Sequence, residues 1–188
     1  MLVIKHKLVT FFLFFLIFLI SFALAENLQT IQLNKLFDAL SKVDNINDGN
    51  QLEKKIWNVW NKHPQNKGLT DKLEFGTELM YQGSYKYALK VFTNIIETDP
   101  YWSEAWNKRA TLLFFMRYYQ RSLSDIEKVL NIEPRHFGAL SGRAQIFIEL
   151  EEYQKAISDL KEAKKIYPLI KTNNLIKELK KLLKGLSI

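Results

Sequence analysis

The stretch that decides the fold runs from Glu104 to Pro134 and reads EAWNKRATLLFFMRYYQRSLSDIEKVLNIEP. It is the middle copy of a unit that recurs on both sides, because Pro100 and Pro168 lie at equal distances along the chain before and after Pro134. A fixed period of roughly 20–50 residues predicts an array in which each unit buries its apolar face against its neighbours.

The copies agree at more than their prolines, since small residues align with small residues and large apolar residues align with large ones. One small position holds Gly76, Ala110 and Ala144. The other aligned sets are Leu79, Leu113 and Phe147; Tyr85, Tyr119 and Tyr153; Ala88, Ser122 and Ala156; and Phe92, Ile126 and Leu160. The spacing predicts helix pairs over 70–81 and 85–98, 103–117 and 119–132, and 137–150 and 153–167.

This pattern resembles the tetratricopeptide repeat in three copies, over residues 68–101, 102–135 and 136–168. Small residues where two helices cross, an aromatic residue that opens the second helix and a closing proline are the marks of that family. The resemblance implies an all-α solenoid of antiparallel helix pairs whose first helices line a concave, ligand-holding surface. It implies no enzymatic activity.

Helical segments flank the repeats on both sides. Residues 26–67 predict two helices that end at Pro64, and we interpret this pair as a degenerate first unit of the array. Residues 169–188 predict an amphipathic helix that covers the exposed end of the stack, with an apolar stripe opposite Lys177, Lys180, Lys181 and Lys184. The alternative for this last helix is contact with a membrane surface or with anionic lipid.

The amino-terminal residues have the three parts of a secretory signal peptide in the usual order. Residues 5–7 are KHK, residues 8–22 are largely apolar, and Ala23 and Ala25 supply the small residues of a cleavage site before Glu26. We expect residues 1–25 to be removed and the mature protein to reside in the periplasm of a Gram-negative bacterium. The alternative is an uncleaved inner-membrane anchor facing the periplasm, because the apolar segment over residues 8–22 approaches the roughly 17–25 residues that span a bilayer.

Composition excludes several classes of protein. The chain has no cysteine, so disulfides cannot stabilise it and helix packing must do so alone. The net charge is +7, and cations alternate with acids until the carboxy-terminal helix. A nucleic-acid binder concentrates its cations on one face, so we expect no nucleic-acid partner.

The sequence contains no recognisable catalytic or metal-binding motif. His63 and His136 lie in different predicted loops, without a second histidine or a carboxylate at metal-ligand spacing, and we interpret both as solvated loop residues. There is no glycine-rich phosphate loop and no G-x-S-x-G turn. We therefore expect neither an enzyme nor a bound metal or cofactor.

One charge pattern is shared by two repeats and lacking in the first. Arg109 precedes Asp125 by the same separation as Arg143 precedes Asp159. The first repeat has Phe75 and Val91 at the corresponding positions. Both members of each pair are ionic or both are apolar, which indicates contact between the paired helices. We predict two partly buried, structural ion pairs.

The concave face is where a partner is expected to bind. Three trios, each spaced four and three residues apart, share one face of the first helices: Leu73, Thr77 and Met80; Asn107, Thr111 and Phe114; and Ser141, Gln145 and Ile148. Family members that capture a C-terminal carboxylate use Lys, Asn and Arg there, and of these the chain has only a displaced Asn107. We therefore expect a segment with apolar anchors. The alternative is that the chain's own terminal helices cover part of this face.

These observations favour an exported, non-catalytic scaffold or adaptor that binds a protein or peptide. Within the family the chain looks like the small, signal-bearing members of Gram-negative bacteria. The alternative is a membrane-tethered envelope assembly factor that retains the amino-terminal helix as its anchor.

Overall fold

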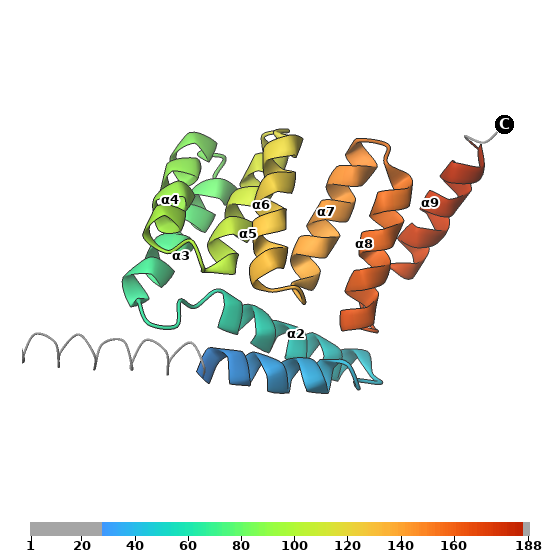
Figure 1. Ribbon diagram of the computed structural model, residues 1–188, viewed down its shortest axis with the longest axis horizontal. Helices are drawn as coiled ribbons and strands as arrows, with labels where there is room; N and C mark the ends of the chain where they lie inside the picture. Colours follow the sequence, from blue (N-terminus) through green and yellow to red (C-terminus); the bar gives the residue numbers. More distant parts are fainter. Residues whose placement is uncertain (1–27, 186–188) are drawn as a thin grey trace, which may run out of the picture.

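The computed structural model describes residues 28–185, and every regular element over this range is a helix. The first helix spans residues 28–40. It is followed by α2 (Ile46–Trp60), α3 (Lys67–Tyr81), α4 (Tyr85–Thr98), α5 (Ser103–Phe115), α6 (Tyr119–Ile132), α7 (Phe137–Glu149), α8 (Tyr153–Ile166) and α9 (Asn173–Gly185). The predicted all-α repeat solenoid is confirmed (Figure 1).

Three helix pairs, α3 with α4, α5 with α6 and α7 with α8, stand side by side in the array, and α9 packs on α8. The aligned small residues lie where the two helices of each pair cross. A Cβ atom added to Gly76 would lie 2.7 Å from Cε1 of Phe92, so a larger residue would push α3 away from α4. Ala110 and Ala144 are the corresponding buried residues of the next two repeats.

The turn inside each repeat uses one residue with positive φ. These residues are Gly83 (φ 77°), Arg117 (φ 59°) and Glu151 (φ 59°), and they recur with the same period as the repeat prolines. Left-handed backbone suits glycine and strains residues that carry a Cβ atom. The second and third repeats therefore keep the turn geometry of the first despite less suitable residues.

The amino-terminal pair does not stack as a first unit, so our interpretation of residues 26–67 as such a unit was wrong. The helix over 28–40 and α2 run across the ends of the repeat helices instead (Figure 1). Their apolar faces share one buried cluster with α7 and α8, made of Leu33, Phe37, Leu40, Ile56, Val59, Trp60, Phe137, Leu140, Ala163 and Tyr167. This arrangement makes the pair a strap beneath the second and third repeats.

Two glycines let the strap approach the repeats closely. A Cβ atom on Gly138 in α7 would lie 2.5 Å from Cη2 of Trp57 in α2. A Cβ atom on Gly49 in α2 would lie 2.8 Å from the hydroxyl of Tyr167 at the end of α8. Both contacts place ring atoms where a side chain would otherwise stand.

The first helix of the first repeat begins earlier than the sequence predicts. The Asn66 side chain accepts a hydrogen bond from the backbone N–H of Leu69 (3.2 Å), so α3 starts at Lys67 rather than at Thr70. The Thr70 hydroxyl instead accepts a hydrogen bond from the backbone N–H of His63 (2.9 Å). Thr70 thus ties α3 to residues 61–66, which connect the strap to the first repeat.

None of the helices within residues 28–185 has the length and apolar character to cross a bilayer. The predicted signal segment, with its cleavage residues Ala23, Ala25 and Glu26, lies outside the described residues.

Candidate binding site

The two ion pairs predicted from the sequence are both in contact. Arg109 donates to Asp125 through Nε (2.7 Å) and Nη2 (2.8 Å), and Arg143 donates to Asp159 through the same atoms (2.8 Å each). The carboxylate side chains are 7% exposed in each pair, and Arg109 and Arg143 are 17% and 25% exposed. The hydrogen bonds that Arg143 donates to the Asp159 carboxylate raise the pKa of Arg143. Each pair joins the two helices of its own repeat.

The predicted concave strip is only partly realised, because three of its nine residues are buried. Leu73 and Met80 are 1% and 3% exposed and belong to the core that α3 and α4 share with α5. Asn107 is 8% exposed, and its amide lies within hydrogen-bond distance of the Glu104 carboxylate. Periodicity placed these residues on one helical face, but the neighbouring repeat covers that face more fully than we expected.

Four of the nine predicted residues meet at one hollow between α5 and α7. Asn107, Thr111, Phe114 and Gln145 line it, and its volume is about 100 Å³. The other residues around this α5–α7 hollow are Ala110, Phe115, Ser122, Ile126, Gly138, Ala139, Gly142 and Ile146. No residue in this set carries a charge, so the hollow suits a neutral group.

Two glycines in α7 shape the hollow, and sequence reasoning missed both. A Cβ atom at Gly142 would meet no atom within 4 Å, so this position opens onto free space. Gly138 lies one turn earlier, beneath Trp57 of the strap. A glycine inside a predicted helix costs stability, so it is itself a sign of close approach or of a site.

The remaining predicted residues do not line the hollow. The hydroxyls of Thr77 and Ser141 donate to carbonyls of their own helices, at Leu73 (2.7 Å) and Phe137 (2.8 Å). Ile148 packs against the cluster that α8 and α9 form around Leu160 and Leu179. The concave face therefore presents one discrete hollow and no continuous apolar strip among the described residues.

Beside this hollow, at the end nearest the strap, lies a fully buried pair of His136 and Glu104. His136 Nδ1 accepts from the backbone N–H of Ala139 (3.0 Å), so the ring proton sits on Nε2, 3.1 Å from the Glu104 carboxylate. Both side chains are 0% exposed. Burial alone would raise the pKa of Glu104, but the hydrogen bond from His136 and the charge of Lys108 hold that pKa below its ordinary value.

His63 forms a second histidine–carboxylate pair, with Asp99. Its Nδ1 accepts from the backbone N–H of Asn66 (2.9 Å), and its Nε2 lies 2.7 Å from the Asp99 carboxylate. The hydrogen bond from His63 lowers the pKa of Asp99. The interpretation of His63 and His136 as solvated loop residues was wrong. The His63 side chain is 5% exposed and packs against the Trp102 ring, with centroids 5.1 Å apart. Trp60 of the strap stacks on the His136 ring with centroids 4.0 Å apart.

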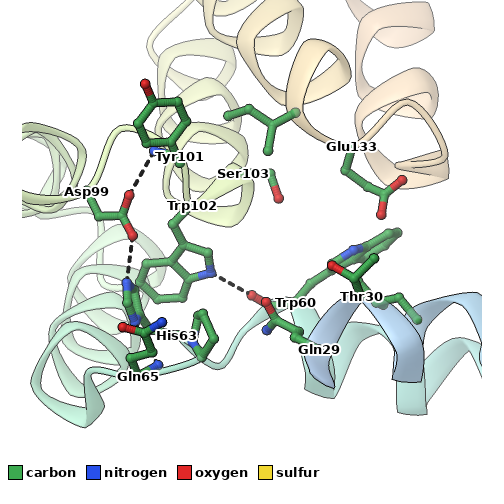
Figure 2. A pocket seen from close by; sticks show the side chains of 13 residues that line it. Gln29, Thr30, Trp60, His63, Gln65, Asp99, Tyr101, Trp102, Ser103 and Glu133 are labelled. Atoms are coloured by element: carbon green, nitrogen blue, oxygen red, sulfur yellow. Dashed lines mark hydrogen bonds and ion pairs between the residues drawn. The ribbon is translucent and has the colours of Figure 1, made fainter. Parts of the chain in front are cut away.

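A larger pocket of about 390 Å³ lies at the seam between the strap and the repeats (Figure 2). Trp60 and Trp102 wall it, and the Trp102 indole N–H donates to the backbone carbonyl of Trp60 (3.0 Å). The Gln29 amide donates to the carbonyls of Val59 (3.0 Å) and Lys62 (2.9 Å). The Trp102 bond fastens the strap to the repeats, whereas the Gln29 bonds hold the two helices of the strap together.

Neither the α5–α7 hollow nor the seam pocket provides a metal site. Within residues 28–185, no group of three or more histidine, cysteine, aspartate or glutamate side chains gathers closely enough to hold an ion. The two histidine–carboxylate pairs are separate, and each histidine already uses both ring nitrogens.

Comparison with known proteins supports the fold assignment. Residues 138–168 match the family model described as the tetratricopeptide repeat. No curated protein matches the chain.

Several solved structures share the fold. The TPR domain of Arabidopsis OM64 is 22% identical with a TM-score of 0.57, and the match covers 61% of this chain and 96% of that one. The TPR2B domain of yeast Sti1, in complex with Hsp70, is 20% identical with a TM-score of 0.55, covering 61% and 94%. The Yersinia enterocolitica secretion chaperone SycD, solved with a peptide of the translocator YopD, is 16% identical with a TM-score of 0.56, covering 67% and 97%.

Proposed function

We propose that this chain is a non-catalytic adaptor for a protein partner. The support is its tetratricopeptide-repeat fold, together with the match of its third repeat to the model of that family. The α5–α7 hollow is the observation that carries this proposal. Similar structures were solved with peptides bound, among them SycD with a translocator peptide and the first TPR of Spaghetti with an HSP90 peptide.

The hollow selects a partner segment by size and by charge. An apolar cavity of roughly 150 Å³ accommodates a benzene ring, so about 100 Å³ leaves room for one aliphatic side chain. The lining carries no cation that would hold a terminal carboxylate. Gln145 is exposed at the rim and offers hydrogen bonds to a partner's backbone. The partner is therefore an extended or helical segment with a single aliphatic anchor, not an acidic chain terminus.

The experiment uses a photo-crosslinking residue at Gln145 in the living cell, with the same residue at exposed Glu162 on α8 as a matched control. We expect a discrete adduct from position 145 and none from position 162. In a Gly142→Leu background the new side chain fills the hollow, so the adduct should be lost while the melting temperature stays level or rises. An adduct that survives Gly142→Leu, or that forms equally from position 162, contradicts binding at the hollow.

We further propose that the adaptor works outside the cytoplasm, in the periplasm of a Gram-negative bacterium. The support is the sequence of residues 1–25, whose charged, apolar and small-residue parts follow the order of a signal peptide. The mature chain should begin at Glu26, and the intact mass of the protein recovered from the envelope decides this. Recovery of only the full-length, membrane-bound chain would favour the tethered assembly factor instead.

A further inference from the structure

The chain carries its excess positive charge at one end. Residues 160–188 contain eight lysines and two glutamates, a net charge of +6. Residues 26–159 contain 17 lysines and arginines and 18 acidic residues, a net charge of −1. A charge asymmetry of this size between two parts of a chain indicates an anionic partner for the basic part.

The fold places most of these lysines on the outside of the last two helices. Leu179 of α9 is 2% exposed and lies in a cluster with Ile157 and Leu160 of α8, so the apolar side of α9 faces the array. Lys177, Lys180, Lys181 and Lys184 are all exposed. Helix α9 stands at the end of the array farthest from α3 (Figure 1).

The lysines meet an apolar hollow between α8 and α9. Lys161, Lys180 and Lys184 line this hollow of about 370 Å³, together with Gln154, Ile157 and Leu183. None of these three lysines has a carboxylate within 4.0 Å among residues 28–185, whereas Lys155 pairs with Glu152 and Lys165 with Glu162 on the same helix α8. Leu182 is 50% exposed beside them. We call this surface the α8–α9 basic face.

We propose that the α8–α9 basic face binds a membrane that contains anionic phospholipid. Unpaired lysines attract phosphate headgroups as point charges. Leu182 and the apolar floor of the hollow then meet the first apolar part of the lipid. A nucleic acid is disfavoured as the ligand. Nucleic-acid binders add arginines and stacking aromatic rings to their lysines, and the lining of this hollow contains no arginine and no aromatic residue.

This inference is independent of the proposed function, since the α5–α7 hollow and the α8–α9 basic face share no residue. An adaptor bound in this way would hold its partner close to the membrane while the concave face stays free.

The test compares binding of the full chain to vesicles of phosphatidylcholine with and without phosphatidylglycerol. The readout is how the phosphatidylglycerol-dependent binding changes between variants, because residues 1–27, with the basic KHK at 5–7, contribute equally to every variant. The substitutions Lys161→Gln, Lys180→Gln and Lys184→Gln together should lower the phosphatidylglycerol-dependent partition coefficient by at least about tenfold. Added salt should weaken the binding of the unsubstituted chain, because the charges are exposed.

The matched control removes the same charge elsewhere, with Lys54→Gln, Lys55→Gln and Lys62→Gln on the strap and its connection. These lysines are exposed as well, and the control should leave the partition coefficient within about twofold. Equal losses from both triple variants, binding that does not depend on phosphatidylglycerol, or tighter binding to duplex DNA than to vesicles would overturn the proposal.

Discussion

The carboxylate of Glu104 shows how a single residue can be buried and still stay charged. It is 0% exposed and is surrounded by His136, Asn107 and Lys108. A buried charge is tolerated only when its partners replace the lost hydration. The same partners bring together α5, α7 and, through Trp60, the strap.

The lowered pKa of Glu104 predicts how stability depends on pH. The ordinary value for this carboxyl is 4.5 and the folded value lies below it, so the unfolded chain binds the proton first as pH falls. This contribution to the free energy of unfolding is complete above pH 4.5 and is lost as pH drops through the folded pKa. Glu104→Gln should flatten the acid side of the stability curve, measured by urea unfolding. An unchanged slope would show that Glu104 is not linked to folding.

Asp159 belongs to a pair whose removal should depend on what replaces it. Asp159→Ala leaves Arg143 partly buried without its partner, and breaking such a pair costs about 3 kcal/mol. The double change Arg143→Leu with Asp159→Leu should be near neutral, as the apolar residues of the first repeat suggest. Thermal and urea unfolding measure both variants. Equal small losses would mean that the pair adds little to stability.

At the scale of one helix, α7 carries two glycines that should respond in opposite ways to alanine. Gly142→Ala adds a Cβ atom into open space and should stabilise the protein by about 0.5–1 kcal/mol through helix propensity. Gly138→Ala gains the same propensity but places its Cβ atom 2.5 Å from Trp57, so it should destabilise the protein or shift the strap. Melting temperatures decide, and the prediction fails if both variants are stabilised.

The turns between paired helices are a second feature at the element scale. Glu151 has the positive φ that glycine supplies at the matching position of the first repeat. Glu151→Gly should therefore stabilise the third repeat by about 0.5–1 kcal/mol. This net value is the backbone strain that glycine relieves, minus the entropic cost of its greater flexibility in the unfolded chain. Gly83→Ala should lower stability by a similar amount. Urea unfolding of the two variants tests the sign of each.

The strap changes which parts of the whole molecule unfold together. In a simple solenoid, an amino-terminal unit is coupled to the repeat that follows it. Here Phe37 lies in the same cluster as Phe137 and Ala163, so the strap is coupled to α7 and α8.

We therefore predict that Phe37→Ala speeds amide hydrogen exchange in residues 28–40, α2, α7 and α8 and leaves α3 and α4 unchanged. The loss of a buried phenylalanine costs about 3–5 kcal/mol, which is enough to expose such a unit. Phe92→Ala is the matched control, because Phe92 is buried in the cluster that α3 and α4 share with α5. Faster exchange in α3 and α4 from Phe37→Ala would instead show that the strap is coupled to the repeat that follows it in the chain, as in a simple solenoid.

The sequence by itself determined what depends on local spacing. The repeat period set the three helix pairs, because small and large apolar residues must recur where paired helices cross. The contact of Arg109 with Asp125 was predictable because the matching pair of positions is ionic in two repeats and apolar in the first, and both residues lie in one repeat. The sequence also predicts a signal peptide over residues 1–25, and this stays a prediction because these residues lie outside the described part of the chain.

Only the tertiary structure decided how distant segments meet. The spacing in residues 26–67 predicts two helices but does not say which surface they cover. The strap packs on α7 and α8 because Trp57 fits over Gly138 and Trp60 fits over His136. The same contact buried His136, which had been interpreted as solvated. Leu73 and Met80 share the helical face expected to bind a partner, yet packing against α5 buries them. Periodicity identifies the face of a helix, whereas the occupant of that face is settled by contacts between residues far apart in the chain.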